Sequence, residues 1–144
     1  MMNETYFYQQ HVRKMSGILH LERIESSVGT GFPDISAAGD GKQMLIETKV
    51  AKGEWLYFER FQLSFHKKRL RYTDGKGVFV LAMCENDTSI LLWNSADVIA
   101  APREPYKKWN RVKVSDIQNE LMRIEGKWPR DQMQSMARLI IKES

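Results

Sequence analysis

The stretch Phe32-Pro33-Asp34-Ile35 is followed, thirteen residues after its aspartate, by Ile46-Glu47-Thr48-Lys49-Val50. The second stretch is predicted to be a strand, because apolar side chains dominate it and turns with glycine bound it on both sides. Side chains alternate between the two faces of a strand, so Glu47 and Lys49 are predicted to share one face. Asp34 lies before a short apolar segment and a turn, so a neighbouring strand can bring its carboxylate to that pair.

Two carboxylates beside one lysine are the groups that a magnesium-dependent phosphoryl-transfer site needs. Carboxylate oxygens are hard ligands of the kind that Mg²⁺ prefers. A nearby ammonium group can orient the water that the cation activates. Asp34, Glu47 and Lys49 are therefore candidate catalytic residues by their chemistry and their order along the chain.

The same residues resemble the signature of the PD-(D/E)xK nuclease superfamily. The resemblance covers the chain from Arg23 to Val80 and is greatest to the VRR-NUC and phage Holliday-junction-resolvase-like branches. The matching segments, in chain order, are Arg23-Ile24-Glu25, Gly29-Thr30-Gly31-Phe32-Pro33-Asp34, Ile46-Glu47-Thr48-Lys49 and Phe61-Gln62. The resemblance implies an α/β fold: a restriction-endonuclease-like core with a central mixed β-sheet flanked by helices, plus C-terminal helices.

The resemblance also implies how the site is composed. Asp34, Glu47 and the backbone carbonyl of Thr48 would hold Mg²⁺, for which Mn²⁺ can substitute. Lys49 would orient the attacking water and help to deprotonate it. Gln62, on the helix that follows, would contact the active site or the DNA, with an ordinary solvated glutamine as the alternative.

Many nucleases of the superfamily take a further acidic metal ligand from their first helix. In this chain Glu4 is the only acid of that segment and stands at its very start, whereas Gln10 or His11 lies nearer the expected place. Glu25, close to the Gly29-Thr30-Gly31 turn, is the preferred substitute ligand, and a solvated glutamate is the alternative. His11 is expected to pack or to lie at the surface rather than to bind a metal.

Positive charge gathers in one part of the chain. The net charge of the chain is +4, and residues 52–76 hold seven basic residues against three acidic ones, which equals the whole surplus. A patch of one sign beside carboxylates is expected of a protein that binds a phosphate backbone, and a solvated helix face is the alternative. The DNA-binding candidates are Lys52, His66, Lys67, Lys68, Arg69 and Arg71.

Length and composition predict a single nuclease domain over 1–144, with a core at about 18–94 and a helical extension at about 95–144. The only cysteine, Cys84, excludes an intramolecular disulfide, and its place in an apolar run predicts a buried residue. The first residues carry no basic and apolar leader, and no apolar run reaches the roughly 18 residues of a membrane span. A cytoplasmic protein of a bacterial or phage-infected cell is expected.

Apolar periodicity predicts the other elements. Helices are expected at 5–15, 57–72, 95–99, 115–124 and from 129 onward, and strands at 18–26, 77–84 and 89–93. The buried stripe of the helix at 57–72 is expected to consist of Phe58, Phe61, Phe65 and Leu70. Residues 102–113 look irregular, and their interleaved aromatic and basic side chains could clamp nucleic acid or pack over the core. The last two helices could cover the sheet or form a subunit contact.

Chemistry and resemblance together favour a metal-dependent DNA endonuclease. It would be an Mg²⁺-dependent deoxyribonuclease that cuts branched DNA such as a Holliday junction, and a homodimer would supply two matched cuts from one site per chain. Two alternatives stay open. A non-catalytic nucleic-acid-binding domain would retain the fold with a silent site, whereas a structural module would use Glu47 and Lys49 only as a surface ion pair.

Overall fold

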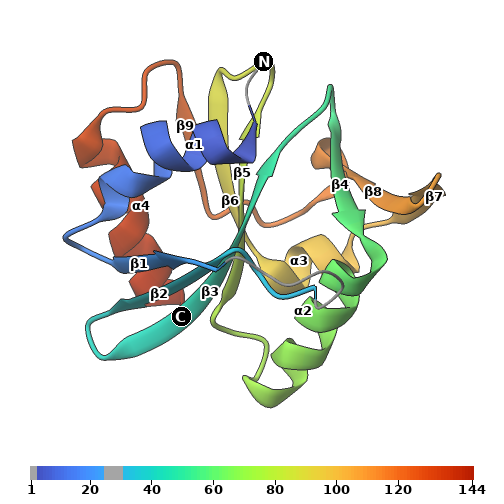
Figure 1. Ribbon diagram of the computed structural model, residues 1–144, viewed down its shortest axis with the longest axis horizontal. Coiled ribbons are helices and arrows are strands. Elements are labelled where there is room, and N and C mark those ends of the chain that lie inside the picture. The colour runs from blue at the N-terminus through green and yellow to red at the C-terminus, as the bar shows by residue number, and fades with distance from the viewer. Residues whose placement is uncertain (1–2, 25–30) are drawn as a thin grey trace.

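The computed structural model describes residues 3–24 and 31–144, and a six-stranded mixed sheet forms its centre (Figure 1). The strand order is β1-β2-β3-β5-β6-β9, in which β3 and β5 run parallel and every other neighbouring pair is antiparallel. The strands are β1 (His20–Arg23), β2 (Ile35–Gly39), β3 (Lys42–Val50), β5 (Val78–Cys84), β6 (Ser89–Asn94) and β9 (Met122–Glu125). The α/β class with a central mixed sheet, expected from the sequence, is confirmed.

Helices cover both faces of this sheet and divide the core into two apolar clusters (Figure 1). On one face lie α1 (Glu4–Gln10), the 3-10 turn Val12–Met15 and α4 (Arg130–Glu143), and on the other lie α2 (Arg60–Tyr72) and α3 (Ser95–Ala100). Strand β5 is buried on both faces: Phe79, Leu81 and Met83 join the first cluster, while the residues between them join the second. This is the two-residue alternation of a strand covered on both sides.

The same alternation places the polar residues of β3. Met44 and Ile46 pack in the first cluster, beneath α1 and α4. Glu47 and Lys49 consequently face α2, and both are buried, with 2% and 7% of their surface exposed. The prediction that these two side chains share one face is confirmed.

A smaller antiparallel sheet of three strands, ordered β4-β8-β7, projects beside α2 (Figure 1). It consists of β4 (Trp55–Glu59), β8 (Trp109–Lys113) and β7 (Arg103–Tyr106). The expectation of irregular structure at 102–113 is therefore wrong. Pro105 was the reason not to expect a strand in this segment. However, β7 pairs only with β8, and an edge strand tolerates a proline because one side of its backbone needs no partner.

The helix expected at 115–124 is also absent. A short 3-10 turn at Val114–Asp116 is followed by extended chain and by β9, which pairs with β6 at the sheet edge. The apolar spacing suggested one helix face, but Ile117 packs in the second cluster and Ile124 in the first. Residues bound for opposite faces of a sheet can imitate helical periodicity.

Two other helices are shorter than expected. The first ends at Gln10 and continues as the 3-10 turn, and the helix expected at 57–72 begins only at Arg60, because β4 occupies the preceding residues. Its expected buried stripe is only partly confirmed: Phe58 is buried, but in β4. Phe61 is 45% exposed, whereas Leu63 and His66 are the buried residues of the helix. The strand expected at 18–26 spans His20–Arg23 among the residues described.

The other predicted elements lie close to their expected positions. Strands β5 and β6, helix α3 and the last helix lie where periodicity predicted them. Cys84 is buried in the second cluster. Within residues 3–24 and 31–144, no helix combines the length and the apolarity needed to cross a membrane.

Candidate functional site

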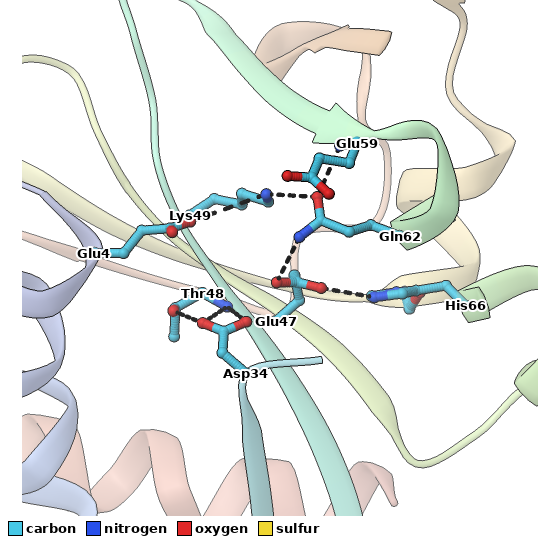
Figure 2. Close-up of polar contacts among 9 residues, drawn as sticks. Glu4, Asp34, Glu47, Thr48, Lys49, Glu59, Gln62 and His66 are labelled. Atoms are coloured by element: carbon cyan, nitrogen blue, oxygen red, sulfur yellow. Dashed lines mark hydrogen bonds and ion pairs between the residues drawn. The ribbon is translucent and has the colours of Figure 1, made fainter. Parts of the chain in front are cut away.

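Asp34 lies immediately before β2 and is held against β3 (Figure 2). Its carboxylate oxygens accept hydrogen bonds from the Thr48 N–H at 3.2 and 3.3 Å, and one of them also accepts from the Thr48 hydroxyl. Its backbone carbonyl accepts from the Ile24 N–H at 2.7 Å. The two stretches that the sequence set apart thus meet at one end of the β2–β3 pair.

Glu47 is the buried carboxylate of the site. Its Oε1 lies 3.1 Å from His66 Nε2, and its Oε2 accepts from Gln62 Nε2 at 3.4 Å. Burial raises the pKa of Glu47 well above its usual range, and the hydrogen bond and negative charge of Asp34 raise it further. The charge of Asp34 therefore disfavours the ionisation of Glu47, an effect that a divalent cation would relieve.

Lys49 points its ammonium group into the same space (Figure 2). Its Nζ donates to Gln62 Oε1 at 2.9 Å and lies 4.7 Å from the centre of the Phe58 ring. The Glu4 carboxylate lies 3.9 Å away on the other side. An aromatic ring, an amide and a carboxylate together fix the position of this charge.

Gln62 joins the carboxylate to the ammonium group. It donates to Glu47 and accepts from Lys49, and its Oε1 also accepts from the Glu59 N–H at 2.9 Å. The last bond belongs to a capping box, in which the Glu59 side chain accepts from the backbone N–H of Gln62 in return. The start of α2 is thereby tied to the site, and Gln62 contacts two of the predicted site residues, Glu47 and Lys49.

His66 corrects one prediction. The run of basic residues after it suggested a DNA-binding histidine, but His66 is 1% exposed and lies between Glu47 and Ser95, whose hydroxyl is 2.6 Å from Nδ1. Burial, with the charge of Lys49, lowers the pKa of His66 to about 4, so the ring is neutral at pH 7. A neutral ring that accepts from the Ser95 hydroxyl donates its Nε2–H to Glu47. One signal in the sequence pointed here: His66 follows Gln62 by four residues and so shares its helix face.

Glu4 is the residue that sequence reasoning passed over. It opens α1, behind an Asn3 N-cap, and reaches Lys49. Burial raises its pKa, Lys49 lowers it, and the negative charge of Asp34 raises it, so Glu4 shares the electrostatics of the site. Its being the only acid of the first helix was the signal available.

The other candidates for the additional acidic position fare differently. Gln10 is exposed at the end of α1, and His11 packs edge-on against Trp128 with 4.3 Å between ring centres. The expectation that His11 packs rather than binds a metal agrees with this contact. Glu25 lies outside the described residues.

The donor set fits a hard divalent cation. Across residues 3–24 and 31–144, no three His, Cys, Asp or Glu side chains form a ready-made metal cluster. Mg²⁺ does not require one, since one or two carboxylates, with water and phosphate oxygens, commonly complete its shell. Asp34 and Glu47 supply the carboxylates. The Thr48 carbonyl leaves β3 on the same side as the N–H that binds Asp34, because the N–H and C=O of one strand residue point to the same neighbour.

The remaining DNA-binding candidates lie outside the site. Lys67, Lys68 and Arg71 are exposed along α2, Arg69 is half-buried, and Lys52 is exposed in the turn before β4. At the helical rise of about 1.5 Å per residue, the basic part of α2 extends about 14 Å along the axis from Gln62. These charges can therefore flank the site without entering it.

No protein-family model matches the chain, and no curated protein matches it. Solved structures that are similar in three dimensions include two nucleases. One is Hjc of Archaeoglobus fulgidus, a Holliday junction resolvase from an archaeal hyperthermophile, at 16% identity and a TM-score of 0.51, covering 82% of this chain and 86% of that one. The other is D212, a nuclease from a fusselovirus, at 9% identity and a TM-score of 0.47, covering 86% and 77%. The likeness to Hjc shows a shared fold, the restriction-endonuclease-like arrangement of a mixed sheet between helices.

Proposed function

We propose that this chain is a metal-dependent endonuclease that hydrolyses phosphodiester bonds of branched DNA. The observation that carries the proposal is the convergence of Asp34, Glu47 and Lys49 at one end of β3, where Gln62 links the last two and Thr48 binds Asp34. The fold shared with a junction resolvase supports it. The motif order supports placing the chain in the VRR-NUC or phage resolvase-like branch of the PD-(D/E)xK superfamily.

Each residue has a separate task in this proposal. Asp34, Glu47 and the Thr48 carbonyl would hold Mg²⁺ or, in its place, Mn²⁺. Such a cation lowers the pKa of a coordinated water and neutralises charge on the phosphate. Lys49 would hold the attacking water by hydrogen bonding and take part in removing its proton, in a place that Gln62 and Phe58 fix.

Two further residues act through Glu47 and Lys49. His66 donates to Glu47 and so selects the direction in which the carboxylate presents its oxygens. Glu4, on the far side of Lys49, balances the ammonium charge and is near enough to the site to contribute an additional acidic group. Glu4 therefore takes the role of the first-helix acid that the resemblance called for.

The partner we propose is DNA with a branch. The exposed basic side chains of α2 and of the turn before β4 could bind phosphates on either side of a scissile bond. Lys and Arg contacts to phosphate position a duplex without reading its sequence. A junction needs two cuts, and a homodimer with one site per chain would place them symmetrically. The products would be a 5′-phosphate and a 3′-hydroxyl.

The test is cleavage of a four-way junction, a flap and a linear duplex of shared sequence, with Mg²⁺ or Mn²⁺. The proposal predicts metal-dependent cleavage that favours a branched substrate and is lost in Asp34→Asn. Asp40→Asn is the matched control, because it makes the same chemical change at an exposed turn residue away from the site. DNA binding without cleavage under either metal would instead favour the non-catalytic nucleic-acid-binding domain.

A further inference from the structure

The β4-β8-β7 sheet has one buried and one open face. Leu56 and Phe58 of β4 and Val112 of β8 point inward and are fully buried in the second apolar cluster. Strand alternation then directs the residues between them outward. The outward residues of the three strands are Trp55, Tyr57, Glu59, Trp109, Arg111, Lys113, Glu104 and Tyr106.

Planar side chains stand in a row on this open face. The Arg111 guanidinium lies 4.0 Å from the centre of the Trp55 ring and 4.5 Å from that of Tyr106. Tyr106 in turn meets Tyr57 edge-on at 5.7 Å between ring centres. Glu104 fixes the plane of Arg111 by accepting its Nε–H at 2.6 Å. The row is thus ordered before any ligand arrives.

The face carries positive charge and remains open to solvent. Tyr106 is 39% exposed, and Trp55, Tyr57 and Trp109 keep part of their surface exposed. Arg111 and Lys113 are paired with acids. Beside the row stand three lysines that form no ion pair within the described part of the chain: Lys52, Lys107 and Lys108. They lie 5.9, 5.6 and 5.7 Å from the ring centres of Tyr57, Tyr106 and Trp109, respectively.

This combination matches one kind of ligand. Aromatic rings and a guanidinium plane stack on bases, and unpaired lysines attract phosphates, the two features of surfaces that bind single-stranded nucleic acid. A duplex cannot use the rings, because its bases already stack on one another. A protein partner fits poorly, since lysine is depleted in protein interfaces. We infer that the outer face of the β4-β8-β7 sheet is a stacking platform for unpaired DNA bases.

The platform adjoins the candidate active site. Strand β4 ends at Glu59, which caps α2 and binds Gln62 through its backbone N–H. Unpaired nucleotides at a branch could therefore lie on the platform while the adjacent duplex reaches the carboxylates. The role of the platform at a DNA branch rests on the proposed function. Stacking of bases on the platform itself needs neither a metal ion nor cleavage.

The experiment measures binding in EDTA by full-length protein carrying Asp34→Asn. The probes are an oligothymidylate and an abasic oligonucleotide of equal length, which have the same phosphate charge but differ in bases. The platform predicts tighter binding of the oligothymidylate and quenching of tryptophan fluorescence on binding. Tyr106→Ala and Trp55→Leu should each weaken that binding roughly tenfold while changing abasic binding little.

Two further variants separate stacking from charge and from misfolding. Arg111→Lys keeps the charge but loses the planar group, so it should weaken oligothymidylate binding more than abasic binding. Tyr72→Ala, which removes an 80% exposed ring at the end of α2, should change neither. Thermal melting of each variant checks that it is folded, and Tyr106, on an edge strand, is the substitution least coupled to the core.

Equal affinity for the two probes, or platform variants that bind like the parent, would overturn the inference. So would light scattering that shows Trp55→Leu to dissociate a dimer, since the face would then be covered by a second copy. Failure of the proposed function looks different: wild-type protein would stack on oligothymidylate yet leave junctions uncut in Mg²⁺ and Mn²⁺.

Discussion

Gln62 shows what a single amide contributes at the residue scale. Glu47 and Lys49 stand two residues apart on β3, and Gln62 links them because it donates to one and accepts from the other. An amide can do both because it carries a donor and an acceptor on one planar group. A glutamate here could not donate to Glu47, and a leucine could hold neither partner.

Replacing Gln62 by Ala should therefore misplace Lys49. We expect cleavage in a single-turnover assay to fall by roughly 100-fold, the scale on which small misplacements act. Loss of the capping box should also lower the free energy of unfolding by about 1 kcal/mol. Ser64→Ala, an exposed change on the same helix, is the control and should leave cleavage unchanged. A Gln62→Ala enzyme of normal rate would show that Lys49 needs no such support.

His66 should matter to the metal rather than to DNA. Because its Nε2–H holds Glu47, we expect His66→Ala to raise the Mn²⁺ concentration needed for half-maximal cleavage by roughly 10- to 100-fold, as for other partners of metal-binding carboxylates. His66→Gln keeps a donor and should recover part of the loss. DNA affinity in EDTA should stay the same.

His20, whose side chain is 73% exposed, provides the control, and His20→Ala should alter neither quantity. If His66→Ala weakened DNA binding but left the metal dependence intact, the original expectation of a DNA-binding histidine would be restored.

The buried carboxylate makes stability depend on pH. A raised pKa means that folded Glu47 holds its proton more tightly than the unfolded chain does, so stability falls as pH rises from the ordinary value of 4.5 through the raised pKa. His66 contributes the opposite trend between pH 4 and 6.5, because its pKa is lowered to about 4. The contribution of Glu47 disappears when it is replaced by Gln.

Thermal melting in EDTA should therefore show that the melting temperature of Glu47→Gln rises relative to that of wild type as pH rises above 4.5. Melting with Mg²⁺ in place of EDTA should reduce the difference between the two proteins. If the difference between the two melting temperatures stayed constant across the pH range, the burial of an ionised Glu47 would be contradicted.

At the element scale, the position of α2 depends on a close backbone approach. Gly31 has φ +68°, and a Cβ built on it would lie 2.0 Å from the carbonyl oxygen of Phe61. No side chain fits that gap, so the segment leading to Asp34 packs directly on the first turn of α2. The glycine therefore allows the Asp34 carboxylate and the Gln62 amide to reach the same candidate site.

Gly31→Ala should accordingly push α2 away from β3. We expect a loss of about 1–3 kcal/mol from overpacking, in addition to the cost of the left-handed backbone, and reduced cleavage. Gly41→Ala is the matched control: its φ is +77° but nothing lies within 4 Å, so it reports the backbone cost alone. Urea unfolding measures both. Equal losses at Gly31 and Gly41 would mean that the contact with Phe61 carries no energy.

Elements could be predicted where the local pattern had one reading. Strand β5 is a continuous apolar run between two turns, helix α4 follows one helical period, and both were predicted within a few residues. Prediction failed where apolar residues of an extended segment imitated a helical period, as with Ile117 and Ile124, and where β4 needed its partner β8 from a distant segment. Long-range pairing of this kind leaves no local signal.

Site residues follow the same division. Asp34, Glu47 and Lys49 belong to short stretches and were predicted from them. His66 looked like part of a basic surface, because only the angle of α2 over the sheet turns it inward. Glu4 reaches the site through the packing of α1, which the sequence near it does not specify.

For the whole molecule, topology explains why these residues meet. Strands β3 and β5 are parallel neighbours, so the chain between them must cross over the sheet. That crossover contains β4 and α2, and α2 lies on the face to which Glu47 and Lys49 point (Figure 1). The helix that completes the parallel connection also delivers Gln62 and His66. A restriction-endonuclease-like fold thereby assembles one site from segments far apart in sequence.

The central claim is that Asp34 and Glu47 share one divalent cation. Titration with Mn²⁺, followed by electron paramagnetic resonance of the free ion, measures this directly without DNA or turnover. Wild-type protein and Asp40→Asn should bind Mn²⁺ alike, whereas folded Asp34→Asn and Glu47→Gln should each bind it at least roughly tenfold more weakly. If all four proteins took up Mn²⁺ with the same affinity, the two carboxylates would not form a metal site.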